Sequence, residues 1–378
     1  MAVDADPTVE PAAWRDPRKP LWPLALLVPT LPFAGFALWR AGGGAWAWWF
    51  TPVVVFGLIP VIDLLRGDDR QNPPEEAVPR LSADGYYRWL TYLYLPAQYA
   101  AVVLCCAVWT RDGLSVAGAA GLVATVGVVN GIAINTAHEL GHKRERVERW
   151  LSKVALAPTG YGHFYVEHNR GHHVRVATRE DPASSRLGES FWAFWPRTVF
   201  GSLRSAWRLE TSRFRVRGRS PWTHRNDVLN AWAMTLVLYA ALTLAFGPGV
   251  LPFLALQAVV GFSLLEVVNY LEHYGLARQR TAAGRYEKVD PRHSWNSDRT
   301  VTNVFLFQLQ RHSDHHANPL RRYQALRSFD TAPQLPAGYA TMVVVALVPP
   351  LWRRVMDHRV LAHYGGDRTR ANVHRRRS

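Results

Sequence analysis

Nine of the 15 histidines in this chain fall in four short boxes, whose sequences are HELGH, EHNRGHH, NYLEHYG and RHSDHH. They are His138, His142, His168, His172, His173, His273, His312, His315 and His316. Neutral imidazole binds iron, copper and zinc alike. Because one tetrahedral zinc ion uses only about four ligands, nine clustered histidines predict a site for two metal ions.

The spacing within each box predicts which imidazoles share an ion. His138 and His142 are four residues apart, so a helix would place both on one face, where they can bind the same ion. His168 and His172 repeat this spacing and are expected to form a second pair. His173, rotated by roughly 100° on an ideal helix, would reach the other ion. RHSDHH can supply ligands to both ions from a single turn.

The remaining six histidines lie in polar or arginine-rich surroundings and have no partner at ligand spacing. We expect each of them to be a surface or hydrogen-bonding residue, and we single out the histidine of PRHSWNSD for attention. The six are His163, His224, His293, His358, His363 and His374.

The composition indicates an integral membrane protein. Of the 378 residues 48% are hydrophobic, and the chain has 16 tryptophans and a net charge of +15. A basic surplus with many aromatic residues can indicate nucleic-acid binding, but the sequence has no signature of an RNA- or DNA-binding module. The apolar residues instead gather in runs of about 20, the length that crosses a bilayer as a helix. We therefore expect the lipid bilayer, and no nucleic acid, as a partner.

Six apolar runs predict an all-α membrane protein with six transmembrane helices. The runs are residues 21–41, 46–66, 90–110, 114–136, 228–247 and 250–271. The connections AGGGA, RDG and GPG are very short, so we expect three helical hairpins. A seventh apolar stretch, residues 339–352, is short and carries Pro349 and Pro350, which favours an interfacial or buried helix over a span.

Charge predicts the orientation of the chain in the membrane. The segments 67–89, 137–227 and 272–378 lie outside the predicted spans, and the last two are rich in basic residues. By the positive-inside rule these segments and both termini face the cytoplasm. We therefore expect a single domain over residues 1–378 in the inner membrane of the cell, with the metal site in a helical cytoplasmic cap.

Three classes of protein could carry these boxes. HELGH matches the zinc-peptidase signature, in which Glu139 would activate water, but most of the nine histidines would then have no role. A non-catalytic metal-binding protein collects ions with loose, repetitive histidine tracts, whereas these boxes have specific spacings and lie far apart. The pattern His-x3-His, His-x3-His-His and His-x2-His-His resembles the membrane fatty acid desaturase and hydroxylase superfamily, whose members oxidise their substrates.

Longer motifs resemble one branch of that superfamily, the alkane 1-monooxygenases, which are integral-membrane alkane hydroxylases. The motifs are residues 57–76, 138–143, 167–192, 269–276, 293–298 and 309–327. Xylene-type methyl monooxygenases and fatty acyl desaturases or hydroxylases share the box spacing and are the alternatives. Glu272 directly before His273, within NYLEHYGL, favours the alkane branch.

The resemblance implies a di-iron enzyme that uses O2 to hydroxylate the terminal methyl group of linear alkanes to 1-alkanols. Histidine ligands bring no negative charge, so we expect acidic residues beside the imidazoles to orient them and to balance the charge of two iron ions. The candidates lie within the boxes, and Glu272 ranks first. They are Glu139, Glu167, Glu272 and Asp314.

The chain encodes no electron carrier of its own. Its two cysteines, Cys105 and Cys106, are adjacent within an apolar run, so they form no iron-sulfur knuckle. Flavin and haem motifs are also absent from the sequence. The resemblance implies rubredoxin as the electron donor, with rubredoxin reductase upstream, and a basic cytoplasmic face would attract a small acidic donor.

The second predicted span indicates where the substrate binds. Asp63 lies near its cytoplasmic end, and because a carboxylate is costly in hydrocarbon, we expect it to face the protein interior or a polar cavity near the metals. Val55 lies eight residues earlier, about 12 Å along the helix and nearly on the same face. A substrate chain rising from the metals would pass Val55, whose small side chain leaves room for medium to long alkanes.

Overall fold

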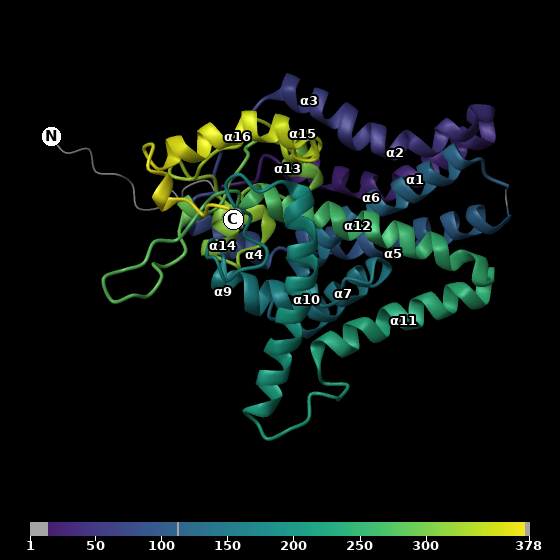
Figure 1. The fold of residues 1–378 in the computed structure, drawn as a ribbon. Helices are drawn as coiled ribbons and strands as arrows, with labels where there is room; N and C mark the ends of the chain where they lie inside the picture. Colours follow the sequence, from purple (N-terminus) through teal and green to yellow (C-terminus); the bar gives the residue numbers. More distant parts are fainter. Residues whose placement is uncertain (1–13, 112, 375–378) are drawn as a thin grey trace, which may run out of the picture.

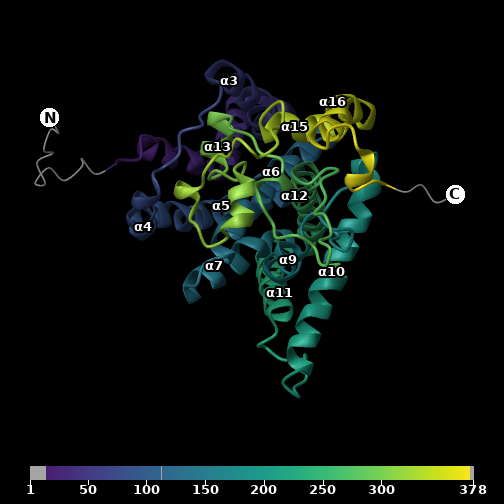
Figure 2. The same ribbon diagram turned by 90° about the vertical axis from the view of Figure 1, so that its left-hand side faces the viewer.

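The computed structural model describes residues 14–111 and 113–374, and within these ranges the chain forms helices joined by loops (Figure 1). The described ranges contain no β-strand, only isolated bridges such as that between Asp68 and Arg299. Long helices run side by side, and shorter helices cover one end of them (Figures 1 and 2). The fold is therefore all-α, as predicted.

Five helical segments in the described ranges are long and apolar enough to cross a membrane. They are Lys19–Arg66, Gly85–Arg111 (α5), Val116–Gly141 (α6), Asp227–Phe246 (α11) and Pro248–Glu272, which contains α12 (Leu251–Glu272). Each predicted span overlaps one of these segments. Their number is five because the first segment contains both of the first two predicted spans.

That first segment has 48 residues, and a straight helix of this length would extend about 72 Å. It instead turns at Gly42 and Gly44, whose φ angles of 93° and 58° are accessible to glycine without strain. α1 (Leu27–Leu38) therefore contacts α2 (Phe50–Val53), and Figure 1 shows α2 and α3 (Ile59–Arg66) running back along α1. The count of six spans is thus not confirmed as such, since the turn lies inside one continuous helical segment.

α6 is the central helix of the bundle. Every residue from 125 to 141 is buried, which is typical of a helix packed on all sides. A Cβ atom at Gly127 would lie 2.5 Å from the side chain of Val260 in α12, and one at Gly131 would lie 2.8 Å from the backbone oxygen of Gly261. Small residues let the two helix backbones approach this closely. Because α6 ends in HELGH, this packing also fixes the direction of the first histidine box.

Short helices gather at the end of the bundle that carries the boxes (Figures 1 and 2). They are α4 (Val78–Ala83), α7 (Arg146–Leu156), α8 (Phe164–Val166), α9 (His173–Arg175), α13 (Thr300–Phe305) and α14 (His312–Ala317). A longer helix, α10 (Phe191–Arg215), lies across the bundle rather than along it (Figure 1).

The apolar stretch at residues 339–352 forms α15 (Tyr339–Ala346) and the start of α16 (Pro349–His363). Pro349 and Pro350 begin α16, because the first turn of a helix does not use the N–H that proline lacks. Trp352 is fully buried, and α15 contacts α12. This agrees with the prediction of an interfacial or buried helix rather than a span, although the stretch contains a break between two helices.

The close contact between α6 and α12 generates a stability prediction. We expect Gly131→Ala to destabilise the protein by about 1–3 kcal/mol, because the added Cβ atom would meet a backbone oxygen, which cannot rotate away. Gly57→Ala is the matched control, since its Cβ atom would meet only Val53, at 4.0 Å. Thermal unfolding in detergent measures both variants, and equal midpoints would contradict the packing argument.

Candidate metal centre

The four histidine boxes converge at one end of the bundle. HELGH ends α6, EHNRGHH leads into α9, NYLEHYG ends α12, and RHSDHH forms α14. The imidazoles form two sets, and the candidate donor atoms within each set lie within 4.8 Å of one another. The first set is His138, His142, His168, His173 and His315, and the second set is His172, His273, His312 and His316.

Two boxes distribute their histidines as their spacing predicts. His138 and His142, at the end of α6, belong to the same set. α14 supplies His315 to the first set and His312 and His316 to the second, so one turn serves both. In these boxes the chain follows ordinary α-helical geometry, in which residues four apart share a face.

The prediction that His168 and His172 share an ion is wrong. These two histidines belong to different sets, and His168 is joined instead by His173. The reason is that Glu167–His172 is a π-helix, in which hydrogen bonds connect residues five apart. Residues five apart then share a face, and Nε2 of His168 lies 3.1 Å from Nε2 of His173. The wider turn sends His172 to the second set.

The separations between donor atoms fit metal ions. Nε2 of His138 lies 2.8 Å from Nε2 of His315, and Nε2 of His312 lies 2.9 Å from Nε2 of His316. Two ligands at right angles around an ion, with bonds of about 2.1 Å, are about 3.0 Å apart. Each set therefore contains a pair of nitrogens at the separation that a shared ion requires.

Several donor atoms also lack any other partner. The buried Nε2 atoms of one histidine in the first set and two in the second have no hydrogen-bond partner among the described residues: His142, His172 and His273. A buried polar atom without a partner costs about 1–3 kcal/mol, which binding to a metal ion would remove. Burial, assisted by neighbouring imidazoles, lowers the pKa well below the ordinary histidine value for His142, His168, His173, His312, His315 and His316. These rings are therefore neutral, the form that binds metals.

Two rings of the second set are held on their outer side by oxygen atoms. Nδ1 of His172 lies 2.9 Å from Oδ2 of Asp181, and Nδ1 of His273 lies 3.2 Å from the backbone oxygen of His293. An acceptor at Nδ1 keeps the proton there and leaves the Nε2 lone pair free for a metal ion. His293 is thus a buried hydrogen-bonding residue, and its own ring contacts Glu287 at 3.0 Å.

Asp181 is a site residue that the sequence patterns did not reveal. It is buried in the loop after α9, where it accepts hydrogen bonds from the hydroxyl of Ser184 at 2.6 Å and from the backbone N–H of Ala183 at 3.2 Å. Burial alone would raise the pKa of Asp181, but its interaction with His172 and the hydrogen bond from Ser184 lower it to about 2. The one available signal was an acidic residue followed by proline, nine residues after His172.

Three of the four predicted acidic partners contact other groups instead of imidazoles. Glu139 lies 2.9 Å from Nζ of Lys143 and accepts a hydrogen bond from the backbone N–H of Tyr323, so it is not free to activate water as in a zinc peptidase. Glu167 lies 2.6 Å from Arg175. A nearby cation attracts a carboxylate more strongly than a neutral imidazole does. The expected role in orienting the rings is therefore not supported for these two residues.

Asp314 forms hydrogen bonds that stabilise the segment after α14. It accepts hydrogen bonds from the side chain of Asn318 at 2.7 Å, from Arg321 at 3.0 Å and from the backbone N–H of Arg327 at 2.9 Å. None of these described contacts reaches an imidazole. Asp314 therefore stabilises the turn after the box rather than a ring within it.

Glu272 is the predicted acidic residue that does reach a histidine. Its Oε2 lies 3.2 Å from Nε2 of His312, the same nitrogen that faces His316. Its Oε1 is buried and has no hydrogen-bond partner among the described residues. Glu272 therefore brings a carboxylate to the side of the second set where an ion would bind.

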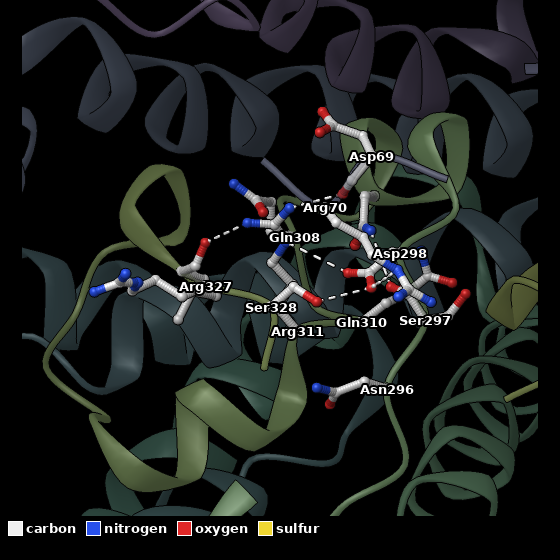
Figure 3. A network of polar contacts seen from close by, with 12 residues as sticks. Asp69, Arg70, Asn296, Ser297, Asp298, Gln308, Gln310, Arg311, Arg327 and Ser328 are labelled. Carbon is white, nitrogen blue, oxygen red and sulfur yellow. Dashed lines mark hydrogen bonds and ion pairs between the residues drawn. The ribbon is translucent and has the colours of Figure 1, made fainter. Parts of the chain in front are cut away.

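A buried network around Arg311 holds α14 in place (Figure 3). Arg311 comes directly before His312, is 1% exposed, and donates to the backbone oxygens of Leu326 at 2.7 Å and Asp69 at 2.8 Å. It lies 3.9 Å from the carboxylate of Asp298. Burial lowers the pKa of Arg311 to about 10, which still leaves it charged at neutral pH. The network connects three separate segments to the start of the last box.

An apolar cavity connects the first helical segment to the histidines. Val55, which is buried, lines this cavity, and so do three of the candidate ligands, His138, His168 and His312. Glu272 lies in the same wall. Most of the remaining wall is apolar and comes from α1, α3, α6, α12, α13 and α15. The structure therefore brings Val55 and the histidines to one cavity, although they lie far apart in the sequence.

Asp63 faces the protein interior, as predicted, but it does not line this cavity. Its carboxylate accepts hydrogen bonds from the backbone N–H groups of Val301 at 2.8 Å and Thr302 at 3.0 Å, and from the hydroxyl of Thr302. It therefore satisfies N–H groups at the start of α13. The expected role in binding substrate is replaced by a role in positioning Thr302, which does line the cavity.

The six isolated histidines all lie outside the two sets. His224 and His358 are exposed, in agreement with the prediction. His163 differs, because it is buried between aromatic rings, with that of Tyr161 at 4.3 Å, rather than in polar surroundings.

Comparison with known proteins agrees with this geometry. An alkane 1-monooxygenase of Acinetobacter baylyi is 50% identical over 326 residues, which cover 86% of this chain and 80% of that protein. An alkane 1-monooxygenase of Alcanivorax borkumensis is 46% identical over 354 residues, which cover 93% of this chain and 87% of that protein. The chain belongs to the alkane 1-monooxygenase family.

Membership of the alkane 1-monooxygenase family agrees with two further findings. Residues 114–346 match the family model described as fatty acid desaturase, a family that is typically iron-dependent. A xylene/toluene monooxygenase hydroxylase component of Pseudomonas putida is 24% identical over 314 residues, 82% of this chain and 81% of that protein. This lower identity favours the alkane branch over the xylene branch. With its five long apolar segments, the chain is a multi-pass membrane protein.

The contact between Asp181 and His172 generates a prediction about metal affinity. We expect Asp181→Ala to weaken metal binding about 10–100-fold, because the ring of His172 would lose the acceptor that orients it. Glu180→Ala is the matched control, since Glu180 is exposed and contacts Tyr286 and Arg280 instead. Iron content after titration with a chelator measures the difference. Equal retention of iron by the two variants would contradict the proposed role of Asp181.

Proposed function

We propose that the protein is a membrane-bound di-iron monooxygenase that hydroxylates the terminal methyl group of linear alkanes to 1-alkanols. The observation that carries this proposal is the single apolar cavity lined both by Val55 and by three candidate ligands, His138, His168 and His312. An apolar cavity suits an unfunctionalised hydrocarbon, and metals held by the histidines in its wall would lie beside the bound chain. The alkane 1-monooxygenase relatives support the same class of substrate.

We propose that the first set of histidines binds one iron ion and the second set binds another. The convergence of the donor atoms and the absence of other described partners for several of them support this ligand assignment. When bound, the irons would supply the activation of O2, with two electrons and protons, so that one oxygen atom enters the substrate and the other leaves as water. Glu272 would balance part of the positive charge at the second set, since its carboxylate already lies beside His312.

The shape of the cavity would select the end of the alkane. Internal C–H bonds are weaker than those of the terminal methyl group, so selectivity for the end must come from geometry. Phe56, Ile59 and Leu264 line the cavity and would hold the chain and exclude water. A chain held in this way presents its methyl group to the end that carries the histidines, where proximity favours the reaction.

We further propose six spans in three hairpins within one domain, in the inner membrane. The turn at Gly42 and Gly44 supports a first hairpin, and the contacts between α5 and α6 and between α11 and α12 support the other two. The basic segments 137–227 and 272–378 would face the cytoplasm with both termini and the metal site. Rubredoxin, reduced by its reductase, would then deliver electrons from the cytoplasm.

Ligand substitutions test the metal assignment. We expect alanine at His142, His172, His273 or His315 to abolish formation of 1-octanol from octane and to lower the iron content, because each would remove a ligand. Insertion into the membrane should persist, since none of these side chains packs in a span. His224→Ala is the control, because His224 is exposed and lies outside both sets. Full activity and normal iron content in His273→Ala would remove the third box from the proposed site.

The electron supply is tested by reconstitution of the purified protein. Turnover should require added rubredoxin and its reductase, because the chain carries no motif for an electron-transfer cofactor of its own. With donor limiting, the initial rate should fall as ionic strength rises, because salt screens the attraction between a basic face and an acidic donor. Turnover with NADH alone would contradict this proposal.

The cavity past Val55 predicts a change in chain-length preference. Val55→Trp should lower the rate with hexadecane relative to octane by about tenfold or more, because a bulky ring would fill the part of the cavity that only a longer chain reaches. Val53→Trp is the matched control, since Val53 is 62% exposed on the same segment. Product analysis from a mixture of the two alkanes gives the ratio directly. A wild-type ratio in Val55→Trp would show that the substrate does not pass this residue.

A further inference from the structure

A second hollow lies between the loop 175–186 and α10, and it differs in character from the substrate cavity. It is a groove of about 590 Å³ with a strongly basic lining. Six arginines contribute to its wall: Arg175, Arg179, Arg186, Arg197, Arg204 and Arg208. Glu180 and Asp181 are the acidic residues of the same wall. Arginines therefore outnumber carboxylates in the groove.

Most of the acidic charge in and around the groove is already paired. Asp181 contacts His172, and Glu180 contacts Arg280. Two of the six arginines have carboxylate partners, since Arg175 contacts Glu167 and Arg197 contacts Glu189. The other four have no salt bridge to a carboxylate among the described residues: Arg179, Arg186, Arg204 and Arg208.

The groove therefore holds positive charge that the described chain does not neutralise. Burial, and after it the charge of Arg197, lowers the pKa of Arg186, as expected for a guanidinium group beside another of the same charge. Arg204 and Arg208 are one helical turn apart on α10, and both are exposed. Their guanidinium groups can therefore reach a common ligand. Several arginines around one hollow are suited to a phosphate group, which they bind in bidentate fashion.

The position of α10 indicates where such a phosphate would come from. α10 lies across the ends of the long helices instead of along them (Figure 1). It exposes large aromatic side chains, with Trp192 at 59% and Phe200 at 63%, beside its arginines. Phe200 also lines the groove. Helices with a basic side and exposed aromatic residues lie in the plane of a membrane surface, where phosphates and acyl chains meet.

We propose that this groove binds the phosphate group of an anionic phospholipid, with Arg204 and Arg208 as principal contacts. The groove has the volume of a small-molecule site, whereas a folded acidic protein would need a broad surface. The exposed apolar side chain of Phe200, at the wall of the groove, suits contact with the first carbons of an acyl chain.

Lipid retention by the full-length protein tests the inference independently of the reaction proposed above. The protein would be placed in nanodiscs that contain phosphatidylglycerol and phosphatidylcholine, extracted, and analysed by native mass spectrometry. We expect one phosphatidylglycerol to be retained per chain. The double variant Arg204→Ala/Arg208→Ala should bind it about 30-fold more weakly, the effect of two arginines at a lipid surface.

The matched control is Arg215→Ala/Arg217→Ala, which removes two exposed arginines from the last residue of α10 and the turn just after it, outside the groove. This variant should retain the lipid as the wild type does, and Arg204→Lys/Arg208→Lys should retain part of the binding. Both alanine variants should keep wild-type iron content and thermal midpoint, which separates loss of the site from loss of the fold. If the groove variant is unstable, the lysine variant still decides between charge and structure.

Four outcomes would overturn the inference. Equal retention of phosphatidylglycerol in the groove and control variants would show that the groove is not the site. Equal binding of glycerol 3-phosphate and phosphatidylglycerol would make a soluble phosphate compound the ligand, and equal retention of phosphatidylcholine would remove the role of charge. If the groove variant kept the lipid but required a higher concentration of an acidic electron donor, the groove would be a protein docking site.

Discussion

Nine imidazole rings must be held with their lone pairs directed at one another in a region that is shielded from water. Burial lowers the pKa of most of these rings, which favours the neutral form that binds metals, but it also leaves nitrogen atoms without hydrogen-bond partners in the described structure. Such an arrangement is unfavourable until ions bind, so the surrounding fold must hold it. The oxygen atoms behind His172 and His273 fix two of the rings. The remaining architecture serves to bring the other rings to the same place.

The fold meets this requirement with two kinds of support. α6 and α12 are packed closely through glycines, and their ends deliver HELGH and the pair Glu272 and His273. The other two boxes lie outside the long helices and depend on polar contacts. Arg311 fixes the start of α14 by donating to backbone oxygens in distant segments, and Asp181 fixes His172 from the following loop. Rigid packing and buried polar networks therefore act together at one site.

Much of this site could be predicted from the sequence, because ligand type and helical spacing are local properties. Residue type and spacing predict the nine histidines and the pairing of His138 with His142. They also predict that RHSDHH supplies histidines to both sets. The π-helix at Glu167–His172 could not be predicted from spacing, because an α-helix and a π-helix accept the same residues. Spacing alone therefore groups His168 with His172, whereas the structure brings His168 together with His173. The difference comes from one extra residue in one turn.

Contacts between distant segments account for the other differences. Glu139 and Glu167 bind cations just after their own boxes, whereas the carboxylate that holds the ring of His172, Asp181, lies in a loop with no ligand spacing to mark it. Asp63 lies in the interior as its sequence position predicts, but its partner Thr302, 239 residues away in the sequence, follows from no local pattern.

α14 has a consequence for how the centre assembles. His315 serves one set and His312 and His316 serve the other, all within a single helical turn. An ion bound by either set would therefore order the turn that the other ion needs, and the first ion would raise the affinity for the second. Loading is then cooperative: at limiting iron, the population should divide into empty and filled molecules, with few that hold a single ion.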